Sequence, residues 1–315
     1  MKSFRRSMGV VLQGLILALG ITTVIPATAA EEAPSKDMVL KGDASCTICH
    51  DETDKYPVLA IGKTKHGTIA DKRTPTCASC HGESIGHQKQ SSKVKPDRTF
   101  GKKAETSAVV QNQACLTCHQ GGKLIQWAGS THASRDATCI SCHQVHTARD
   151  KVRDKLTQSQ VCFTCHQDKR AEINRPSHHP ITEGKVACSD CHNPHGSAGR
   201  ADMVRDNVND TCYTCHMEKR GPFVRNHQPV QEDCSICHNP HGTTTPSLLK
   251  ARPPFLCQSC HEPAEHPAAP GAFPGGAASN TANLLARGCV NCHTNIHGTN
   301  NPLDVLGSGG RVFRQ

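Results

Sequence analysis

The pentapeptide pattern Cys-x-x-Cys-His occurs ten times between positions 46 and 293, and the ten copies use all 20 cysteines. No cysteine is left for a disulfide. A Cys-x-x-Cys pair alone also occurs in redox dithiols and zinc sites. A histidine directly after every second cysteine is instead typical of covalent haem attachment, in which both sulfurs form thioethers and the histidine binds the iron. The sequence therefore predicts ten covalently bound haem c groups.

The residues of these ten motifs divide into two predicted sets. The haem-attaching cysteines are Cys46, Cys49, Cys77, Cys80, Cys115, Cys118, Cys139, Cys142, Cys162, Cys165, Cys188, Cys191, Cys212, Cys215, Cys234, Cys237, Cys257, Cys260, Cys289 and Cys292. The proximal iron ligands are His50, His81, His119, His143, His166, His192, His216, His238, His261 and His293.

The chain has 21 histidines, so eleven remain outside the motifs. Ten of them follow a repeat: in each pair of motifs, one free histidine lies between the two motifs and another follows within six residues. The eleventh, His178, fits less well than its neighbour His179. The predicted distal iron ligands are His66, His87, His132, His146, His179, His195, His227, His241, His266 and His297.

Two axial histidines per iron predict bis-histidine, low-potential haem throughout. Only three methionines lie beyond the leader, too few for general His/Met ligation of ten irons. Six-coordinate iron offers no open position to a substrate. The ligand count therefore favours electron transfer over catalysis.

The spacing of three distal histidines constrains which haem they bind. His146, His195 and His241 each lie three residues after a proximal histidine. Three residues span at most about 10 Å, too short to pass comfortably between the two faces of one porphyrin. These histidines are expected to bind a neighbouring haem, and the pairing of the others stays open.

The N-terminus resembles an export signal. Lys2, Arg5 and Arg6 precede an apolar stretch that ends in small residues near Ala29 and Ala30. Residues 1–30 are therefore expected to be a cleaved secretory signal peptide, with an uncleaved anchor as the alternative. No later stretch reaches the ~20 apolar residues of a spanning helix. Residues 31–315 are expected to reside in the periplasm, soluble or enclosed within a protein that spans the membrane.

The composition predicts an unusual fold. With one Trp, two Tyr and seven Phe, the side chains alone would form a thin core, which ten porphyrins would complete. Nineteen prolines and 25 glycines interrupt any long apolar periodicity. We expect a multihaem cytochrome c domain, residues 31–315, with short helices and irregular coil around a row of ten haems and negligible sheet. It would comprise five two-haem modules, or two five-haem halves at 46–166 and 188–293.

The formal net charge of +9 does not indicate a nucleic-acid partner. Without the three basic leader residues it is about +6, and the propionates of ten oxidised haems would bring it to about −4. Basic side chains beside propionates are the simpler interpretation.

Three stretches resemble a known family: "NDTCYTCHMEKRGP" at 209–222, the two CHNPHG copies at 191–196 and 237–242, and "CVNCHTNIHGTNNP" at 289–302. They are similar to the MtrA/DmsE-type periplasmic decahaem cytochromes, and the similarity extends over all ten motifs. The resemblance implies a row of bis-histidine haems inserted into an outer-membrane β-barrel porin. It also implies electron exchange with a periplasmic or inner-membrane cytochrome, and an extracellular multihaem cytochrome is a further candidate partner.

Direction and alternatives stay open at this stage. Relatives carry electrons outward to extracellular Fe(III), minerals or other acceptors, or inward from Fe(II). One alternative is a multihaem oxyanion reductase with one open haem, although no Cys-x-x-Cys-Lys motif is present. Another is a free periplasmic electron shuttle, which co-purification with a porin would distinguish from a porin-bound conduit.

Overall fold

We analysed a computed structural model of the chain, in which residues 43–54, 57–68, 73–261, 289–291 and 293–300 are described. All of them belong to one compact unit, Met38–Gln315. The proposed signal peptide, Cys292 and His266 lie outside the described residues.

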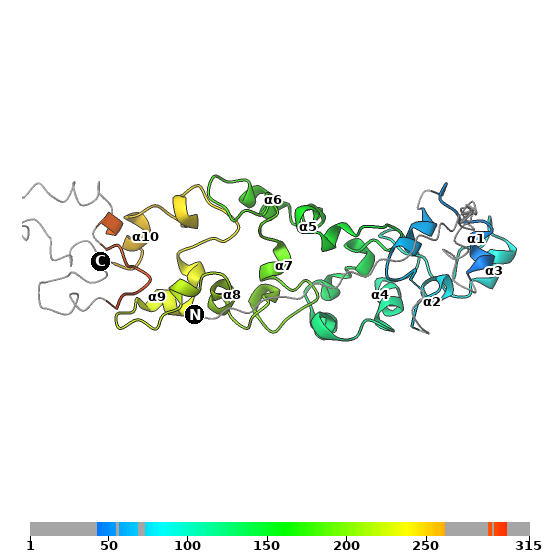
Figure 1. The fold of residues 1–315 in the computed structure, drawn as a ribbon, viewed down its shortest axis with the longest axis horizontal. Helices are drawn as coiled ribbons and strands as arrows, with labels where there is room; N and C mark the ends of the chain where they lie inside the picture. The colour runs from blue at the N-terminus through cyan, green and yellow to red at the C-terminus, as the bar shows by residue number, and fades with distance from the viewer. Residues whose placement is uncertain (1–42, 55–56, 69–72, 262–288, 292, 301–315) are drawn as a thin grey trace, which may run out of the picture. The chain divides into compact units, whose positions relative to one another are not determined.

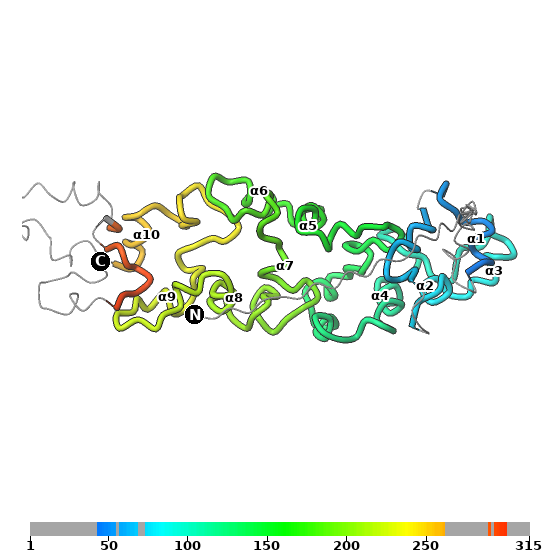
Figure 2. Tube along the Cα trace, viewed as in Figure 1, coloured from blue at the N-terminus to red at the C-terminus, as the bar shows by residue number. Residues whose placement is uncertain are grey.

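Short helices joined by irregular chain make up this unit (Figures 1 and 2). The longest described helix, α4, has nine residues. The α-helices are α1 (Ala44–Thr47), α2 (Cys77–His81), α3 (Ile85–Lys89), α4 (Ala108–Leu116), α5 (Lys155–Cys162), α6 (Gln167–Ile173), α7 (Cys188–Cys191), α8 (Val208–Tyr213), α9 (Gln228–Glu232) and α10 (Phe255–Gln258).

Short 3-10 segments of three to six residues supply most of the remaining regular structure. They are η1 (Val58–Lys63), η2 (Gly122–Leu124), η3 (Trp127–Gly129), η4 (Ala133–Arg135), η5 (Cys139–Ser141), η6 (Lys151–Arg153), η7 (Arg200–Asp202), η8 (Met217–Lys219), η9 (Cys234–Ile236), η10 (Pro246–Leu248) and η12 (Cys289–Asn291).

Side-chain caps fix where several of these helices begin. Ser107 accepts a hydrogen bond from the backbone of α4, Asp154 from that of α5 and Asn207 from that of α8. Thr76 and Ser79 form a reciprocal capping box at the start of α2. Each cap satisfies N–H groups that a helix cannot satisfy internally. The motifs therefore begin at defined positions although their helices are at most about two and a half turns long.

The expected absence of regular sheet is confirmed for the described ranges. Pairing there is limited to four isolated bridges: Ser177 with Thr243, His192 with Met203, Arg225 with Thr299 and His238 with Leu249. The predicted architecture of short helices and irregular coil is therefore confirmed for the described residues.

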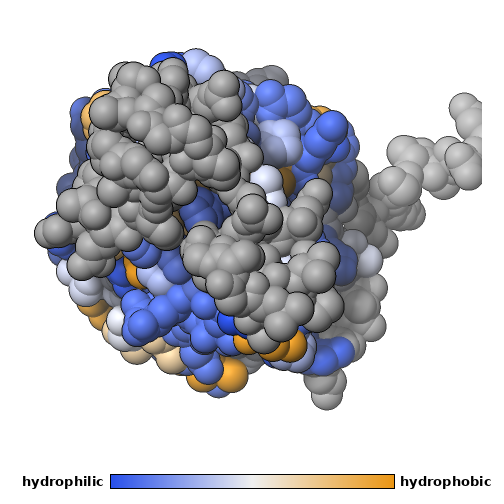
Figure 3. Space-filling model, turned by 90° about the vertical axis from the view of Figure 1, so that its left-hand side faces the viewer, coloured by the Kyte–Doolittle hydropathy of each residue, from blue (hydrophilic) through white to orange (hydrophobic). Residues whose placement is uncertain are grey.

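The apolar core is thin, as the composition predicts. Among the described residues, the buried apolar side chains are Ala114, Trp127, Ile173, Ile181 and Ala187, and buried polar residues outnumber them. No helix among the described residues is long and apolar enough to cross a membrane. On the face in Figure 3, visible described side chains are mainly hydrophilic, with scattered hydrophobic ones.

Candidate haem-binding sites

The Cys-x-x-Cys-His motifs form single helical turns in the described part of the chain. In nine of them the histidine N–H donates to the carbonyl of the first cysteine, at 2.9–3.1 Å, and the motif at 77–81 forms α2 itself. Residues i, i+3 and i+4 share one face of a helical turn. The two sulfurs and the imidazole are therefore presented together, as covalent attachment of a porphyrin requires.

Nine proximal histidines each face a histidine from outside the motifs. The ring centroids are 5.9–6.3 Å apart in every pair. The pairs are His50 with His87, His66 with His119, His81 with His146, His132 with His166, His143 with His195, His179 with His216, His192 with His241, His227 with His261, and His238 with His297.

This spacing fits two imidazoles bound to opposite sides of one metal atom. Metal–nitrogen bonds of about 2.0 Å, plus about 1.1 Å from each nitrogen to its ring centre, put the centroids about 6.2 Å apart. The angle between ring planes varies from 9° in His143–His195 to 87° in His132–His166. Direct aromatic packing spans about 4.5–7 Å, so a constant distance at variable angle is better explained by a shared atom.

The pairs connect successive two-motif modules reciprocally. We number the modules 1 to 5, with motifs at 46 and 77, 115 and 139, 162 and 188, 212 and 234, and 257 and 289. We call the free histidine between the two motifs of a module its inner histidine, and the free histidine after the second motif its outer histidine. At each junction, the inner histidine of the earlier module faces the first motif of the later module. The later module's outer free histidine faces the earlier module's second motif. His132 with His166 and His195 with His143, for example, join modules 2 and 3.

The three short-spaced histidines follow this rule. His146, His195 and His241 face the second motif of the preceding module and not the motif three residues before them. His87 differs, since it faces His50 within module 1.

The loop that carries the outer histidine of one module also orients the inner histidine of the preceding module. His132 Nδ1 donates to the Pro194 carbonyl at 2.8 Å, and His179 Nδ1 donates to that of Pro240 at 2.7 Å. Pro194 directly precedes His195 in CHNPHG, as Pro240 precedes His241. A hydrogen bond at Nδ1 fixes the tautomer and aims Nε2 at the metal. Each CHNPHG loop therefore serves both sides of its junction.

The asparagine and glycine of CHNPHG shape this loop. Asn193 Oδ1 accepts from the His195 N–H at 3.3 Å, and its Nδ2 donates to the Gly196 carbonyl at 2.6 Å. Gly196 has a φ of +100°, and a Cβ there would lie 2.6 Å from the Gln126 carbonyl oxygen. Asn239 and Gly242 repeat the arrangement. Glycine permits both the backbone conformation and the close approach to the preceding module.

Buried polar side chains join the two motifs within a module, which the sequence analysis did not anticipate. Asn112 Oδ1 accepts from the Cys139 N–H at 2.8 Å, and Asn209 Oδ1 accepts from the Cys234 N–H at 2.7 Å. In module 1, Asp43 accepts from the Cys77 N–H at 2.7 Å. Each acceptor lies three residues before its module's first cysteine, a repeat that could have been found in the sequence.

Module 3 uses a variant of the same contact. Gln158, four residues before Cys162, accepts from the Ser189 N–H at 3.0 Å and donates to the Ser189 hydroxyl at 3.0 Å. Because all four acceptors are buried, these hydrogen bonds are shielded from competing water. They set how the two motifs of a module face each other.

The first cysteines of each module also contact each other. In every module the thiols of these two cysteines lie close enough to interact: Cys46 with Cys77, Cys115 with Cys139, Cys162 with Cys188, Cys212 with Cys234, and Cys257 with Cys289. The two haem-attachment sites of one module would therefore be adjacent. Among the described residues, no group of three or more His, Cys, Asp or Glu could share a metal ion, which distinguishes these cysteines from a zinc cluster.

The electrostatic environment suits neutral imidazole ligands. Burial lowers the pKa of seven paired histidines, which favours the unprotonated ring that a metal requires. They are His66, His81, His146, His195, His227, His241 and His297.

His178 is held away from these pairs. Its Nδ1 contacts the Arg175 carbonyl at 2.5 Å and its Nε2 lies 3.6 Å from Glu183. Its neighbour His179 faces His216 instead. The structure thus favours His179 of the two, in line with the sequence pattern.

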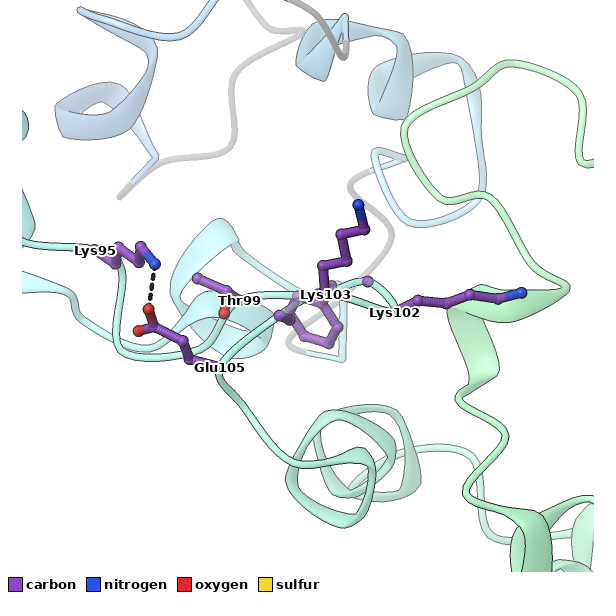
Figure 4. Close-up of a pocket in the computed structure, with 8 residues that line it drawn as sticks. Lys95, Thr99, Lys102, Lys103 and Glu105 are labelled. Carbon is purple, nitrogen blue, oxygen red and sulfur yellow. Dashed lines mark hydrogen bonds and ion pairs between the residues drawn. The ribbon is translucent and has the colours of Figure 1, made fainter.

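Beside the second motif of module 1 lies a polar pocket of about 440 Å³ (Figure 4). Lys95 forms an ion pair with Glu105 at its rim, while the Lys102 and Lys103 side chains point away from that pair. Phe100 also lines this pocket and packs edge-to-face on His81, with 5.1 Å between the two ring centroids. A residue that lines this pocket, Phe100, therefore covers a paired imidazole, and no Cys-x-x-Cys-His motif lines the pocket.

Sequence comparison independently identifies the class. A family described as a doubled CXXCH motif matches residues 178–221 and 227–266, and a family of cytochrome c-type, NrfB-like proteins matches residues 77–156. The protein is a multihaem c-type cytochrome, an electron-transfer protein.

Two relatives refine this assignment. The chain is 43% identical over 275 residues to the multihaem cytochrome MtrA of Shewanella baltica, which covers 84% of this chain and 81% of that protein. It is 34% identical over 149 residues to the cytochrome c-type protein NrfB of Haemophilus influenzae, which covers 41% of this chain and 65% of that protein. The chain belongs to the MtrA family of multihaem cytochromes, and the resemblance noted in the sequence is confirmed.

Proposed function

We propose that the chain holds ten c-type haems, each between a proximal and a distal histidine, and carries electrons along them. The observation that carries the proposal is the set of nine imidazole pairs, each joining one motif histidine to one free histidine at a near-constant spacing. His293 would take the tenth partner, His266, which lies outside the described residues. When bound, each haem supplies a one-electron Fe(III)/Fe(II) couple.

The residues fit this cofactor beyond the ligands. Exposed apolar side chains lie in or beside the motifs: Ile48 within the first, Leu156 on α5 and Phe255 just before Cys257. Such side chains would cover porphyrin faces, and burying them would stabilise the loaded protein. The chain's own contribution is to bind, orient and enclose the cofactors.

The reciprocal pairs favour five linked modules over two independent halves. His143 in 46–166 faces His195 in 188–293, so a ligand pair would cross the proposed boundary. Residues 1–30 are proposed to be a signal peptide removed on export. Sequencing the N-terminus of the mature protein would test cleavage near Ala29 or Ala30.

We further propose that the loaded protein works in the periplasm, within an outer-membrane β-barrel porin. It would exchange electrons with a periplasmic or inner-membrane cytochrome and, outside the cell, with Fe(III), minerals, Fe(II) or an extracellular multihaem cytochrome. Family membership supports this proposal, because the chain spans most of MtrA's length. The mainly hydrophilic described side chains on the face in Figure 3 fit a plug enclosed by a porin, and equally a free shuttle.

Two measurements test the proposal. Haem quantification with EPR of the oxidised protein should give ten haems per chain, all low-spin. A stoichiometric high-spin haem would instead indicate an open site and favour the oxyanion-reductase alternative. Purification from outer membranes should recover a β-barrel porin with the cytochrome, and recovery from the soluble periplasm alone would favour a shuttle.

A further inference from the structure

We propose that Asp150 is a positioning residue that lowers the reduction potential of the haem held by His143 and His195. This inference rests on the proposed ligation. The Asp150 Oδ2 atom lies 2.7 Å from His143 Nδ1. Its Oδ1 accepts from the backbone N–H groups of Gln144 at 3.3 Å and Val152 at 3.4 Å. The carboxylate is thus fixed at Nδ1, and Nε2 on the other side of the imidazole would bind the metal.

The chain provides its own comparison at the equivalent position of two other modules. His192 Nδ1 donates to the Ala201 carbonyl at 2.9 Å, and His238 Nδ1 donates to the Ser247 carbonyl at 2.8 Å. These histidines, like His143, belong to the second motif of a module. Modules 3 and 4 therefore place a neutral carbonyl where module 2 places a carboxylate.

A carboxylate changes the ligand more than a carbonyl does. Its hydrogen bond to Nδ1–H is charge-assisted and makes the imidazole a more basic ligand. The ferric site carries one more positive charge than the ferrous site, so a nearby negative charge stabilises it selectively. The reaction affected is the one-electron reduction of ferric to ferrous iron, in which no bond forms or breaks.

Other carboxylates near paired histidines are more strongly screened. Asp54 lies 2.8 Å from His50 Nδ1, but its side chain is 39% exposed, against 16% for Asp150. Solvent weakens such an exposed interaction.

Glu172 is a second case. It lies 3.4 Å from His241, but Lys169 Nζ is 3.2 Å from both of its oxygens. Within the described ranges, Asp150 makes no ion pair with a lysine or arginine, so its charge is not offset in that way.

The opposite ring adds no compensating hydrogen bond. His195 Nδ1 is buried and has no hydrogen-bond partner among the described residues. The two proposed ligands of this haem therefore differ in their hydrogen bonding at Nδ1, and the Asp150 carboxylate is the main influence on the iron's potential. This haem belongs to module 2 and would have neighbouring haems on both sides. A lower reduction potential at this haem would favour electrons residing on those neighbours.

The test is spectroelectrochemical titration of the full, haem-loaded protein and of Asp150→Asn. Asparagine keeps an oxygen that can accept from His143 and removes the charge. One of the ten titration steps should shift so that reduction becomes about ten-fold more favourable, which corresponds to 59 mV for one electron. The g-values of one low-spin EPR species should change with it.

Asp154→Asn is the matched control. It removes a charge four positions away while keeping an acceptor for the Leu156 N–H, and it contacts no histidine in the described structure. A superimposable titration of Asp150→Asn, or an equal shift in Asp154→Asn, would overturn the inference. If Asp150→Asn does not load ten haems, Asp150→Ser supplies a second neutral variant with the same expected shift.

The wild-type EPR spectrum separates this inference from the proposed function. A high-spin haem in the unaltered protein would contradict the ligand assignment itself, and the inference would fall with it. All-low-spin haem without a shift in the neutral variants would contradict the inference alone.

Discussion

His132 Nδ1 donates to the carbonyl oxygen of Pro194 at 2.8 Å, across 62 residues of sequence. The same loop carries His195, which faces His143 in the module that contains His132. His132 in turn faces His166 in the module that contains Pro194. Two histidine pairs thus cross the junction in opposite directions, and one hydrogen bond couples them, so neither module forms its histidine pairs alone.

Removing His132 should open one haem. The variant His132→Ala leaves His166 without its facing imidazole, so one haem in ten should become high-spin. Low-temperature EPR with spin quantification measures this. His178→Ala is the control, because His178 faces no motif histidine and all haems should stay low-spin. The assignment is wrong if His132→Ala remains entirely low-spin.

Removing the buried asparagine of module 2 should destabilise the protein. In Asn112→Ala the Cys139 N–H and the Ala137 carbonyl lose their partners at 2.8 and 3.0 Å. Unsatisfied buried groups typically cost about 1–3 kcal/mol of unfolding free energy. Urea denaturation followed by circular dichroism measures the loss.

A matched control for this prediction is Asn174→Ala. Asn174 is exposed, and within the described structure its side chain donates only to the Arg170 carbonyl, so removing that side chain should change little. Equal losses of unfolding free energy in the two variants would mean that the buried hydrogen bonds of Asn112 do not stabilise the protein more than an exposed one does.

A methyl group at Gly196 should displace the loop that carries His195. The positive φ alone strains alanine, and its Cβ would meet the Gln126 carbonyl oxygen at 2.6 Å and Ser130 Cβ at 2.8 Å. We expect Gly196→Ala to lose about 1–3 kcal/mol of stability and to weaken ligation by His195. Thermal unfolding and the high-spin EPR signal report the two effects. Gly129→Ala, with open space at its Cβ, should leave both unchanged.

Acid should destabilise the fold. Burial lowers the pKa of His81, His146 and His195 below the ordinary 6.5. The unfolded chain then binds protons that the folded chain does not, so unfolding free energy falls as pH drops below 6.5 toward the folded-state pKa values. Metal ligation acts in the same direction. Melting temperatures at pH 7.5 and pH 5.5 should differ accordingly, and a higher value at pH 5.5 would contradict this.

The sequence by itself determined the chemistry of the chain. Ten Cys-x-x-Cys-His motifs predict haem attachment whatever the fold, because both sulfurs and the ligand lie within five residues. The count of free histidines predicts a second ligand per iron, because eleven remain for ten motifs. The scarcity of aromatic residues and the many Pro and Gly predict short helices without sheet, which the described structure confirms.

Only the tertiary structure decided which histidine faces which. The spacing of His195 excludes its own motif but cannot choose among the others, since the histidine pairs form between segments far apart in sequence. Likewise, the pattern CHNPHG does not predict that the Pro194 carbonyl accepts a hydrogen bond from His132. The sequence also does not predict that Asp150 contacts its motif histidine at the position where Ala201 and Ser247 offer carbonyls in other modules. Those contacts depend on how the loops of adjacent modules pack, and that packing is a non-local property.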